Sequence, residues 1–215
     1  MMRTAEQGAV EGSGSDQKRR QILEGARRVF LGTGFDGASM GEIAKSAGVS
    51  KGTLYTYFDS KESLFETLIM EERAGLAEAL FRLDPDDPDV RAVLHRLGCS
   101  FLAMMVRPEH VASVRIVIGA AEKFPRLGQV FYEAGPRQGI TRLAAYLTQQ
   151  AAAGRLVVAD AELAAQQFLE LCSGAVFKRL LFRVAATPTP TEIERHVGEV
   201  LRVFFAAYGA APPCQ

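Results

Sequence analysis

The sequence predicts an all-α protein of about nine helices, and three observations support this fold class. Apolar residues recur at helical spacing along most of the chain, beginning with Ile22, Ala26, Val29 and Phe30. Serine, threonine and proline stand where helices are expected to begin, and glycine stands where several are expected to end. No segment shows the alternation of apolar and polar residues that is typical of half-buried strands.

Composition excludes several classes of protein. The 215 residues are 48% hydrophobic, and 25 Lys and Arg residues balance 25 Asp and Glu residues. The three cysteines are far apart, with no CxxC or Cys/His cluster, so we expect a reducing compartment, no disulfide framework, no metal and no cofactor. No apolar run reaches the roughly 18 residues that a membrane span needs. We therefore expect a cytoplasmic protein with no membrane partner.

The chain is expected to open with a tail and one helix. Residues 1–16 are rich in Gly, Ser, Glu and Gln without periodicity, which predicts a disordered tail. A first helix follows, with the apolar stripe named above, and Gly32 and Gly34 end it. The basic triplet at 18–20 suits flanking phosphates or the minor groove, and equally suits a solvated helix start.

Residues 39–61, SMGEIAKSAGVSKGTLYTYFDSK, predict two short helices joined by a tight turn. The first helix opens with a capping box and ends at a glycine, and the second has a serine cap and two inward apolar side chains. These structural positions are Ser39 with Glu42, Gly48, Ser50, Leu54 and Phe58. The pattern predicts a helix-turn-helix whose second helix enters the major groove of DNA.

The outer side of this motif carries ammonium and hydroxyl groups and a bare backbone position, a surface suited to phosphates and base edges. The residues expected to contact DNA are Lys51, Gly52, Thr53, Tyr55, Thr56, Tyr57, Lys61 and Ser39. Two tyrosines beside a lysine have no packing reason on an exposed helix, which favours DNA contact. Lys61 lies in the first turn of the next helix, where it is expected to bind a phosphate.

The stretch GASMGEIAKSAGVSKGTLYTYFDSKESLF closely resembles the DNA-binding signature of the TetR family of bacterial transcriptional regulators. The resemblance covers residues 18–68. It implies an all-α homodimeric repressor that binds a palindromic operator in double-stranded DNA. It also implies release when a small apolar or amphipathic molecule occupies the C-terminal domain. Gly41 and Thr56 depart from the pattern, because many relatives carry longer side chains there. Base reading would then rest on Lys51, Thr53 and Tyr55.

Two domains are therefore expected after the tail, residues 17–62 for DNA binding and residues 63–210 for ligand binding and dimerisation. Within residues 17–61, eight basic side chains stand against four acidic ones, a net charge of +4. Because the whole chain is neutral, this positive excess is local, as expected where a protein meets phosphates.

A long fourth helix is expected to reach residue 83, and the acidic loop DPDDPD follows at 84–89. Further helices are expected over 89–105, 108–123, 126–134, 137–153, 160–184 and 190–208. Prolines fall at several of these starts, where a missing N–H costs nothing. Gly135-Pro136 predicts a break or a kink between two of them.

The last two helices carry apolar stripes wide enough for an interface between two copies of the chain. The expected interface residues are Leu171, Val176, Leu180, Val197, Leu201, Phe204, Phe205 and Tyr208. The alternative is that both helices pack into their own subunit. A homodimer also gives two half-sites about 34 Å apart, one turn of DNA.

An apolar ligand pocket is expected between the fourth helix and this bundle, partly because methionines adapt to irregular ligands. The candidate lining residues are Phe101, Met104, Met105, Arg115, Ile118, Phe131, Tyr132, Phe168 and Cys172. For each of them an ordinary core position is the alternative, and the pocket itself rests mainly on the resemblance.

No catalytic residues are expected. The histidines have no metal-ligand spacing, and no phosphate loop, GxSxG or catalytic Cys/His signature occurs. The alternatives to a ligand-released repressor are a helix-turn-helix regulator whose C-terminal domain binds a protein partner and one that activates transcription.

Overall fold

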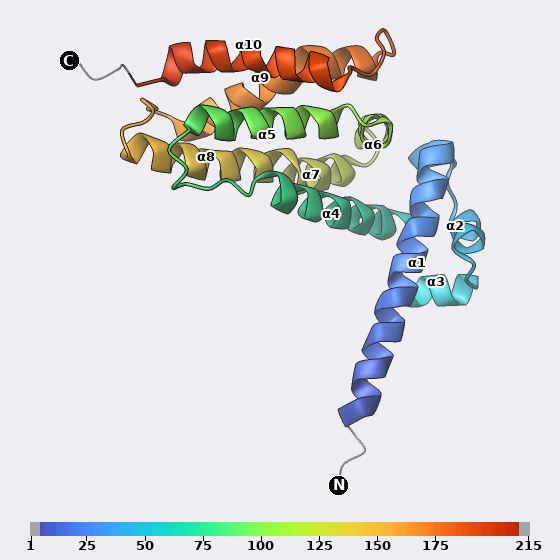
Figure 1. The fold of residues 1–215 in the computed structure, drawn as a ribbon. Coiled ribbons are helices and arrows are strands. Elements are labelled where there is room, and N and C mark those ends of the chain that lie inside the picture. Colours follow the sequence, from blue (N-terminus) through green and yellow to red (C-terminus); the bar gives the residue numbers. More distant parts are fainter. Residues whose placement is uncertain (1–4, 211–215) are drawn as a thin grey trace, which may run out of the picture. The chain divides into compact units, whose positions relative to one another are not determined.

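The computed structural model describes the backbone of residues 5–210 and the side chains of residues 14–73, 75 and 80–210 (Figure 1). Ten helices occur in this part of the chain: α1 (Ala5–Gly37), α2 (Met40–Ala47), α3 (Lys51–Tyr57), α4 (Lys61–Leu80), α5 (Val90–Met105), α6 (Pro108–Ala121), α7 (Pro125–Ala134), α8 (Pro136–Ala152), α9 (Ala161–Leu181) and α10 (Pro190–Tyr208). The extended pairing between these residues is a single antiparallel bridge from Leu156 to Gly209. The predicted all-α fold is confirmed. None of the described helices is both long and apolar enough to cross a bilayer.

The chain divides into two compact units, and the division falls inside α4, α6 and α7. The first unit comprises the residues up to Glu72 together with Ile116–Phe131, and the second comprises Arg73–Arg115 and the residues from Tyr132 onward. The sequence predicts a boundary between residues 62 and 63 instead. The difference arises because the start of α4 and the segment 116–131 share an apolar core with the N-terminal helices.

Helix α1 is longer than the sequence predicts. It begins at Ala5, so helical backbone covers most of the segment 1–16 for which a disordered tail is expected, and residues 1–4 lie outside the described residues. A formed helical turn gains one hydrogen bond for each residue added, which favours such an extension. At the other end, Gly34 has a non-helical backbone (φ 74°), so regular helix stops near the predicted glycine pair.

The core of the first unit combines aliphatic side chains with a cluster of aromatic rings. Ile22, Ile43, Leu54 and Leu64 are fully buried, one from each of the first four helices. The aromatic cluster joins the end of α1 to α4 and to the turn between α6 and α7: its rings are Phe30, Phe35, Phe65 and Phe124, with Phe30 and Phe65 centroids 4.7 Å apart. Each such ring pair contributes about 0.5–1.5 kcal/mol beyond its buried area.

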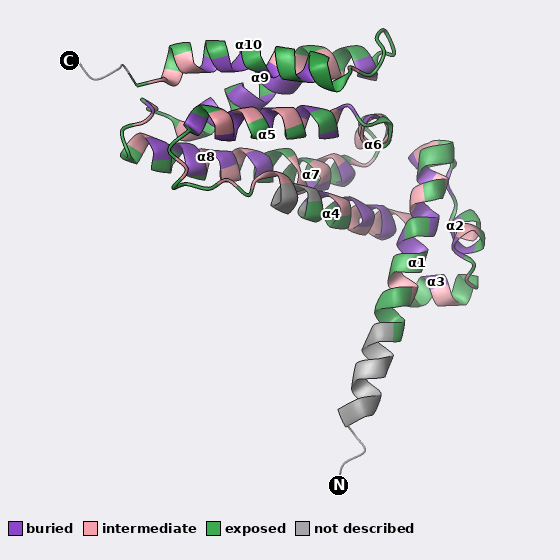
Figure 2. Ribbon diagram, viewed as in Figure 1, coloured by how far each residue is buried: buried purple, intermediate pink, exposed green. Residues whose placement is uncertain are grey.

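The second unit is a bundle of α5, α8, α9 and α10 (Figure 1). Figure 2 shows buried residues along one side of α10 and exposed residues along the other. Gly98 permits a close approach of α5, since a Cβ there would lie 2.8 Å from Cγ1 of Val197 and 3.3 Å from Sγ of Cys172. Helix α10 starts as predicted, with a capping box between Thr189 and Glu192.

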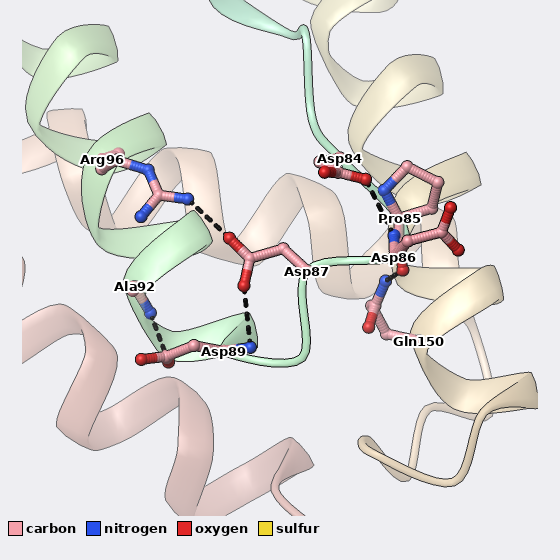
Figure 3. Close-up of polar contacts among 8 residues, drawn as sticks. All are labelled: Asp84, Pro85, Asp86, Asp87, Asp89, Ala92, Arg96 and Gln150. Carbon is pink, nitrogen blue, oxygen red and sulfur yellow. Dashed lines mark hydrogen bonds and ion pairs between the residues drawn. The ribbon is translucent and has the colours of Figure 1, made fainter.

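The acidic loop between α4 and α5 is fixed by bonds within itself and to α8 (Figure 3). One oxygen of Asp87 accepts the Asp89 N–H (3.0 Å) and the other accepts from Arg96 (3.0 Å). Both bonds lower the pKa of Asp87, and the bond from the Asp89 N–H has the larger effect. From α8, the buried amide of Gln150 donates to the Pro85 carbonyl (3.0 Å).

Candidate nucleic-acid interface

Helix α3 is held on the first unit by apolar side chains on its inner face. Leu54 is fully buried, and Phe58, which follows the helix, is 5% exposed. Oγ of Ser50 accepts the Thr53 N–H (3.0 Å) and so caps the first turn, as predicted. The outer face is consequently open to solvent and consists of Lys51, Gly52, Tyr55 and Thr56.

Helix α2 is fixed against α1 by polar contacts at its C-terminal end. Gly48 has a left-handed backbone (φ 65°), which confirms the predicted helix end. Nε2 of Gln21 donates to the Ala47 carbonyl and Nη2 of Arg28 donates to the Ser46 carbonyl, both at 2.6 Å. These carbonyls belong to the last turn, where helix geometry leaves acceptors without partners. The contacts therefore hold the motif at a defined angle on α1.

The hydroxyl groups of α3 make local bonds and keep free acceptor capacity. Oγ1 of Thr53 lies 2.8 Å from Oγ of Ser50, and Oγ1 of Thr56 donates to the Gly52 carbonyl (3.0 Å). Each hydroxyl oxygen has two lone pairs, so a further donor can still be accepted. Tyr55, half-exposed at 50%, extends its phenol from the same face.

Two of the predicted DNA contacts are turned towards the protein. Tyr57 is half-buried and packs against the core of the first unit, which gives this side chain a structural role on the helix. Nζ of Lys61 donates to the carbonyls of Phe35 (2.7 Å) and Ala38 (3.0 Å) and lies 4.5 Å from the Phe35 ring centroid. Two of its three N–H groups are thus used inside the protein, in contrast to the predicted phosphate contact.

Ser39 is exposed and completes the predicted capping box of α2. Its Oγ accepts the Glu42 N–H (3.2 Å), and its own N–H donates to the Glu42 carboxylate (3.0 Å). Its hydroxyl also contacts that carboxylate (2.8 Å). The side chain that the sequence places among the DNA contacts is therefore engaged in building the helix start.

The basic residues of α1 are partly neutralised. Arg19 forms an ion pair with Glu71, and Arg27 forms one with Glu72 (3.1 Å). These pairs link α1 to α4, so the middle residue of the triplet 18–20 is not simply solvated. The neighbouring Lys18 donates to the Gln21 side chain (3.0 Å).

Residues 116–131 belong to the first unit, although the sequence places them in the C-terminal domain. Nζ of Lys123 lies 2.7 Å from a carboxylate oxygen of Asp36, and this hydrogen bond lowers the pKa of Asp36. The ring of Phe124 packs edge-on against Phe35, with centroids 5.0 Å apart. The helix-turn-helix signature ends well before this segment. The apolar spacing of residues 116–131 indicates that one face is buried, but it does not indicate which helices cover that face.

The predicted pocket residues are dispersed. Phe168 and Cys172 are fully buried in the core of the second unit, and burial raises the pKa of the Cys172 thiol to about 12. Ile118 and Tyr132 are exposed, at 61% and 49%. Ile118 and Phe131 belong to the first unit, whereas Phe101, Met104, Met105, Arg115, Tyr132, Phe168 and Cys172 belong to the second. Arg115 donates to the carbonyls of Leu180 and Leu181 at the end of α9.

A hollow of about 630 Å³ lies in the second unit between α9, α10 and the loop that joins them. Its walls carry two positively charged side chains, Arg179 and Arg195, and two negatively charged ones, Glu192 and Glu199. His196 also lines it and contacts the Leu171 and Cys172 carbonyls (3.1 and 3.0 Å) through Nε2. None of the nine predicted pocket residues lines this hollow.

Half of the predicted dimer residues are buried within their own subunit. Val197, Leu201 and Phe204 are at most 2% exposed, and Leu180 is 8% exposed. These four side chains keep little or no surface to contact a second copy, which favours the alternative that both helices pack into their own subunit. Leu171 is exposed, and the remaining predicted residues are half-buried: Val176, Phe205 and Tyr208.

Two family models match the chain. Residues 22–68 match the model of bacterial regulatory proteins of the tetR family, and residues 92–210 match the C-terminal domain of AefR-like transcriptional repressors. Together the matches cover the helix-turn-helix motif and most of the second unit.

One curated relative and two solved structures illustrate the likeness. The HTH-type transcriptional repressor AcnR of Corynebacterium diphtheriae is 40% identical over 63 residues, 29% of this chain, so the chain spans only 33% of that relative's length. A TetR-family regulator from Mesorhizobium loti MAFF303099 has a TM-score of 0.85 at 27% identity, covering 91% of this chain and 98% of the other. The flavonoid-responsive regulator FrrA has a TM-score of 0.80 at 34% identity, covering 93% and 100%.

Proposed function

Because the chain belongs to the TetR family of bacterial regulatory proteins and is a DNA-binding regulator of transcription, we propose that it represses its target genes as a homodimer on a palindromic operator. A small apolar or amphipathic effector releases it from the DNA. The match to AefR-like repressors and the likeness to the repressor AcnR support repression. The observation that carries the proposal is the outer face of α3, which is solvent-exposed while its inner face is fixed by Leu54 and Phe58.

In this proposal α3 lies in the major groove. Lys51, Thr53 and Tyr55 supply donors, an acceptor and a ring to the base edges, as such recognition requires. Gly52 lets the backbone approach closely: a Cβ there would meet nothing nearer than Oγ of Ser50 at 3.8 Å. The free protein has room at this position, so a side chain added there would leave the fold intact. The same side chain would stand between the α3 backbone and the DNA and would weaken binding.

The dimer interface uses the exposed apolar side chains of α9 and α10. Leu163 and Leu171 share one face of α9 and are 47% and 41% exposed, and Val203 on α10 is 44% exposed. Burying them between two copies removes apolar surface from water, at about 25 cal/mol per Å². Val176, Phe205 and Tyr208 stay in the proposed interface because each keeps part of its surface exposed.

The effector is proposed to be a planar aromatic molecule of the flavonoid type. This rests on the flavonoid-responsive regulator FrrA, to which the chain is 34% identical over 93% of its length. Such molecules are amphipathic, with flat apolar rings and a few hydroxyl groups, so they fall within the class of small amphipathic effectors proposed above.

Footprinting on the DNA around the protein's own gene tests the proposal. We expect protection of two half-sites centred about one helical turn apart, related by two-fold symmetry. Adding quercetin or naringenin should abolish the protection, whereas a long-chain fatty acid should leave it unchanged. Protection that survives both flavonoids excludes the proposed effector class. Increased transcription from the bound promoter would indicate an activator instead of a repressor.

Variants of α3 locate the reading surface. Lys51→Ala and Tyr55→Ala should each weaken operator binding by about 1–3 kcal/mol, the range for one good base contact. Gly52→Ala should weaken binding without lowering the temperature at which the protein unfolds. Full binding by all three variants would place the reading surface elsewhere in the molecule.

A further inference from the structure

The end of the Lys51 side chain lies over the backbone of Gly41. Lys51 is the first residue of α3 and Gly41 is the second residue of α2, and they lie on either side of the turn that Gly48 makes. A Cβ built on Gly41 would lie 3.0 Å from Cε and 3.3 Å from Nζ of Lys51. The side chain of the first residue of α3 therefore runs back across the first turn of α2.

Backbone conformation does not require glycine at position 41. Within the described residues, the glycines with a positive φ are Gly34, Gly48 and Gly154, so Gly41 has an angle that any residue can adopt. Glycine also weakens a helix relative to alanine, and α2 spans only 8 residues. What the missing side chain provides here is room for Lys51, since a Cβ 3.0 Å from Cε would make the end of the lysine side chain give way by a few tenths of an ångström.

The packing over Gly41 restricts where the ammonium of Lys51 can point. A lysine free in solvent samples many rotamers, and ordering them costs free energy when a contact forms. A stem resting on the α2 backbone has fewer alternatives, so its ammonium is directed before DNA arrives. Lys51 remains exposed in this arrangement, which leaves its N–H groups available to a base edge or phosphate.

We propose that Gly41 is a specificity-determining residue that acts by positioning Lys51. The inference rests on the proposed function, since it assigns the direction of one DNA contact within it. A larger side chain at 41 displaces the ammonium and brings its own atoms to the same place on the DNA. The size of residue 41 thereby decides whether α2 or the lysine of α3 reads the base pairs at this position.

A double-mutant cycle on the footprinted operator tests the proposal. Gly41→Ala should lower affinity about tenfold in the wild-type background, as expected when one base contact is misplaced. In the Lys51→Ala background the same change should alter affinity less than about twofold, because the lysine it displaces is absent. The control is Gly32→Ala on α1, where an added Cβ meets nothing within 4 Å and affinity should not change.

The base preference at each operator position separates positioning from loss of structure. We expect Gly41→Ala and Lys51→Ala to relax the preference at the same base pairs, with thermal unfolding of Gly41→Ala no earlier than that of the wild type. Equal effects of Gly41→Ala in both backgrounds, or unaltered preference in either single variant, would overturn the inference while leaving the proposed function standing. A wild-type protein that protects no DNA would overturn both.

Discussion

His110 and Arg73 form a polar pair inside the second unit. Nδ1 of His110 lies 2.9 Å from Nη1 of Arg73, which is 6% exposed, and the imidazole also packs against the Phe177 ring. Burial, and then the neighbouring guanidinium, lower the pKa of His110 to about 3. The imidazole is therefore neutral near pH 7 and accepts a hydrogen bond from the arginine.

This pair makes stability depend on pH in a defined direction. An unfolded chain protonates His110 near pH 6.5, whereas the folded protein does not until about pH 3, so the unfolded state binds the extra proton between these values. The stabilisation is complete above pH 6.5 and is lost as the pH falls towards 3. At pH 5 we expect a loss of about 2 kcal/mol relative to pH 7.5. Urea denaturation at both pH values measures it, and an equal loss in His110→Gln would contradict this origin.

Tyr146 offers a second test at the scale of one residue. Its hydroxyl is buried without a hydrogen-bond partner among the described protein atoms, and burial raises its pKa to about 12. Tyr146→Phe removes this uncompensated polar group, so we expect the free energy of unfolding to stay constant or rise by about 1 kcal/mol.

A matched variant on the same helix is Gln150→Leu. The Gln150 amide donates to the Pro85 carbonyl (Figure 3) and accepts from Arg155 (2.6 Å), so its loss should cost about 1–3 kcal/mol. Comparable losses in both variants would show that the Tyr146 hydroxyl is satisfied in solution.

Single residues were predictable from sequence where their role is local. The caps at Ser39, Ser50 and Thr189 follow from short-range geometry, and all three are confirmed. The directions of Tyr57 and Lys61 were not predictable, because they depend on distant partners. Lys61 bonds carbonyls at the end of α1, and no spacing rule in the sequence links these positions.

At the scale of elements, α1 carries two glycines with opposite surroundings. A Cβ on Gly25 would lie 2.6 Å from Cβ of Ala47 on α2, whereas a Cβ on Gly32 would meet nothing within 4 Å. Gly25→Ala should therefore force α1 and α2 apart and cost about 1–3 kcal/mol of stability. Gly32→Ala should gain up to about 1 kcal/mol from helix propensity.

Urea denaturation followed by circular dichroism compares the two variants directly. Equal stability of Gly25→Ala and Gly32→Ala would mean that the two helices do not approach as closely as described. The sequence does not show that Gly25 lies at a close approach, because a close approach depends on what lies opposite and not on the glycine itself.

Helix starts were predicted better than helix ends. Prolines and caps mark the starts of α6, α7, α8 and α10, as expected. Helix α9, predicted to reach residue 184, ends at Leu181, because Arg183 adopts a left-handed backbone (φ 57°). Only a few per cent of residues other than glycine do so, and the sequence has no glycine there to signal the end.

At the scale of the whole molecule, charged substitutions on the exposed and on the buried faces of the last two helices should have different effects. Leu171→Glu with Val203→Glu should give a folded monomer in sedimentation and much weaker operator binding, because these side chains are exposed. Leu201→Glu with Phe204→Glu should unfold the second unit, since it buries charge in a core without a partner. An intact dimer in the first variant would reject the proposed interface.

The sequence predicted the class of fold and the helix-turn-helix motif, but not how the chain divides into two units. The residues of the helix-turn-helix signature follow one another in the sequence, so their spacing alone is enough to predict the motif. Val117, Ala120 and Leu127 pack against residues far away in the sequence. Apolar spacing predicts that such residues are buried, but it does not predict which helix covers them. For the same reason the wide stripe on α10 did not reveal which of its residues face their own subunit.

The sharing of one core by the N-terminal helices and residues 116–131 sets a condition for building hybrid regulators. Phe35 and Asp36 meet Phe124 and Lys123 across that core, so a graft of the N-terminal helices alone would leave an aromatic surface bare. A chimaera that swaps sensory modules has to transplant both pieces together. The same condition applies to natural exchange of domains between paralogues. We expect such exchanges to be accompanied by matching changes at positions 35 and 36 and at positions 123 and 124.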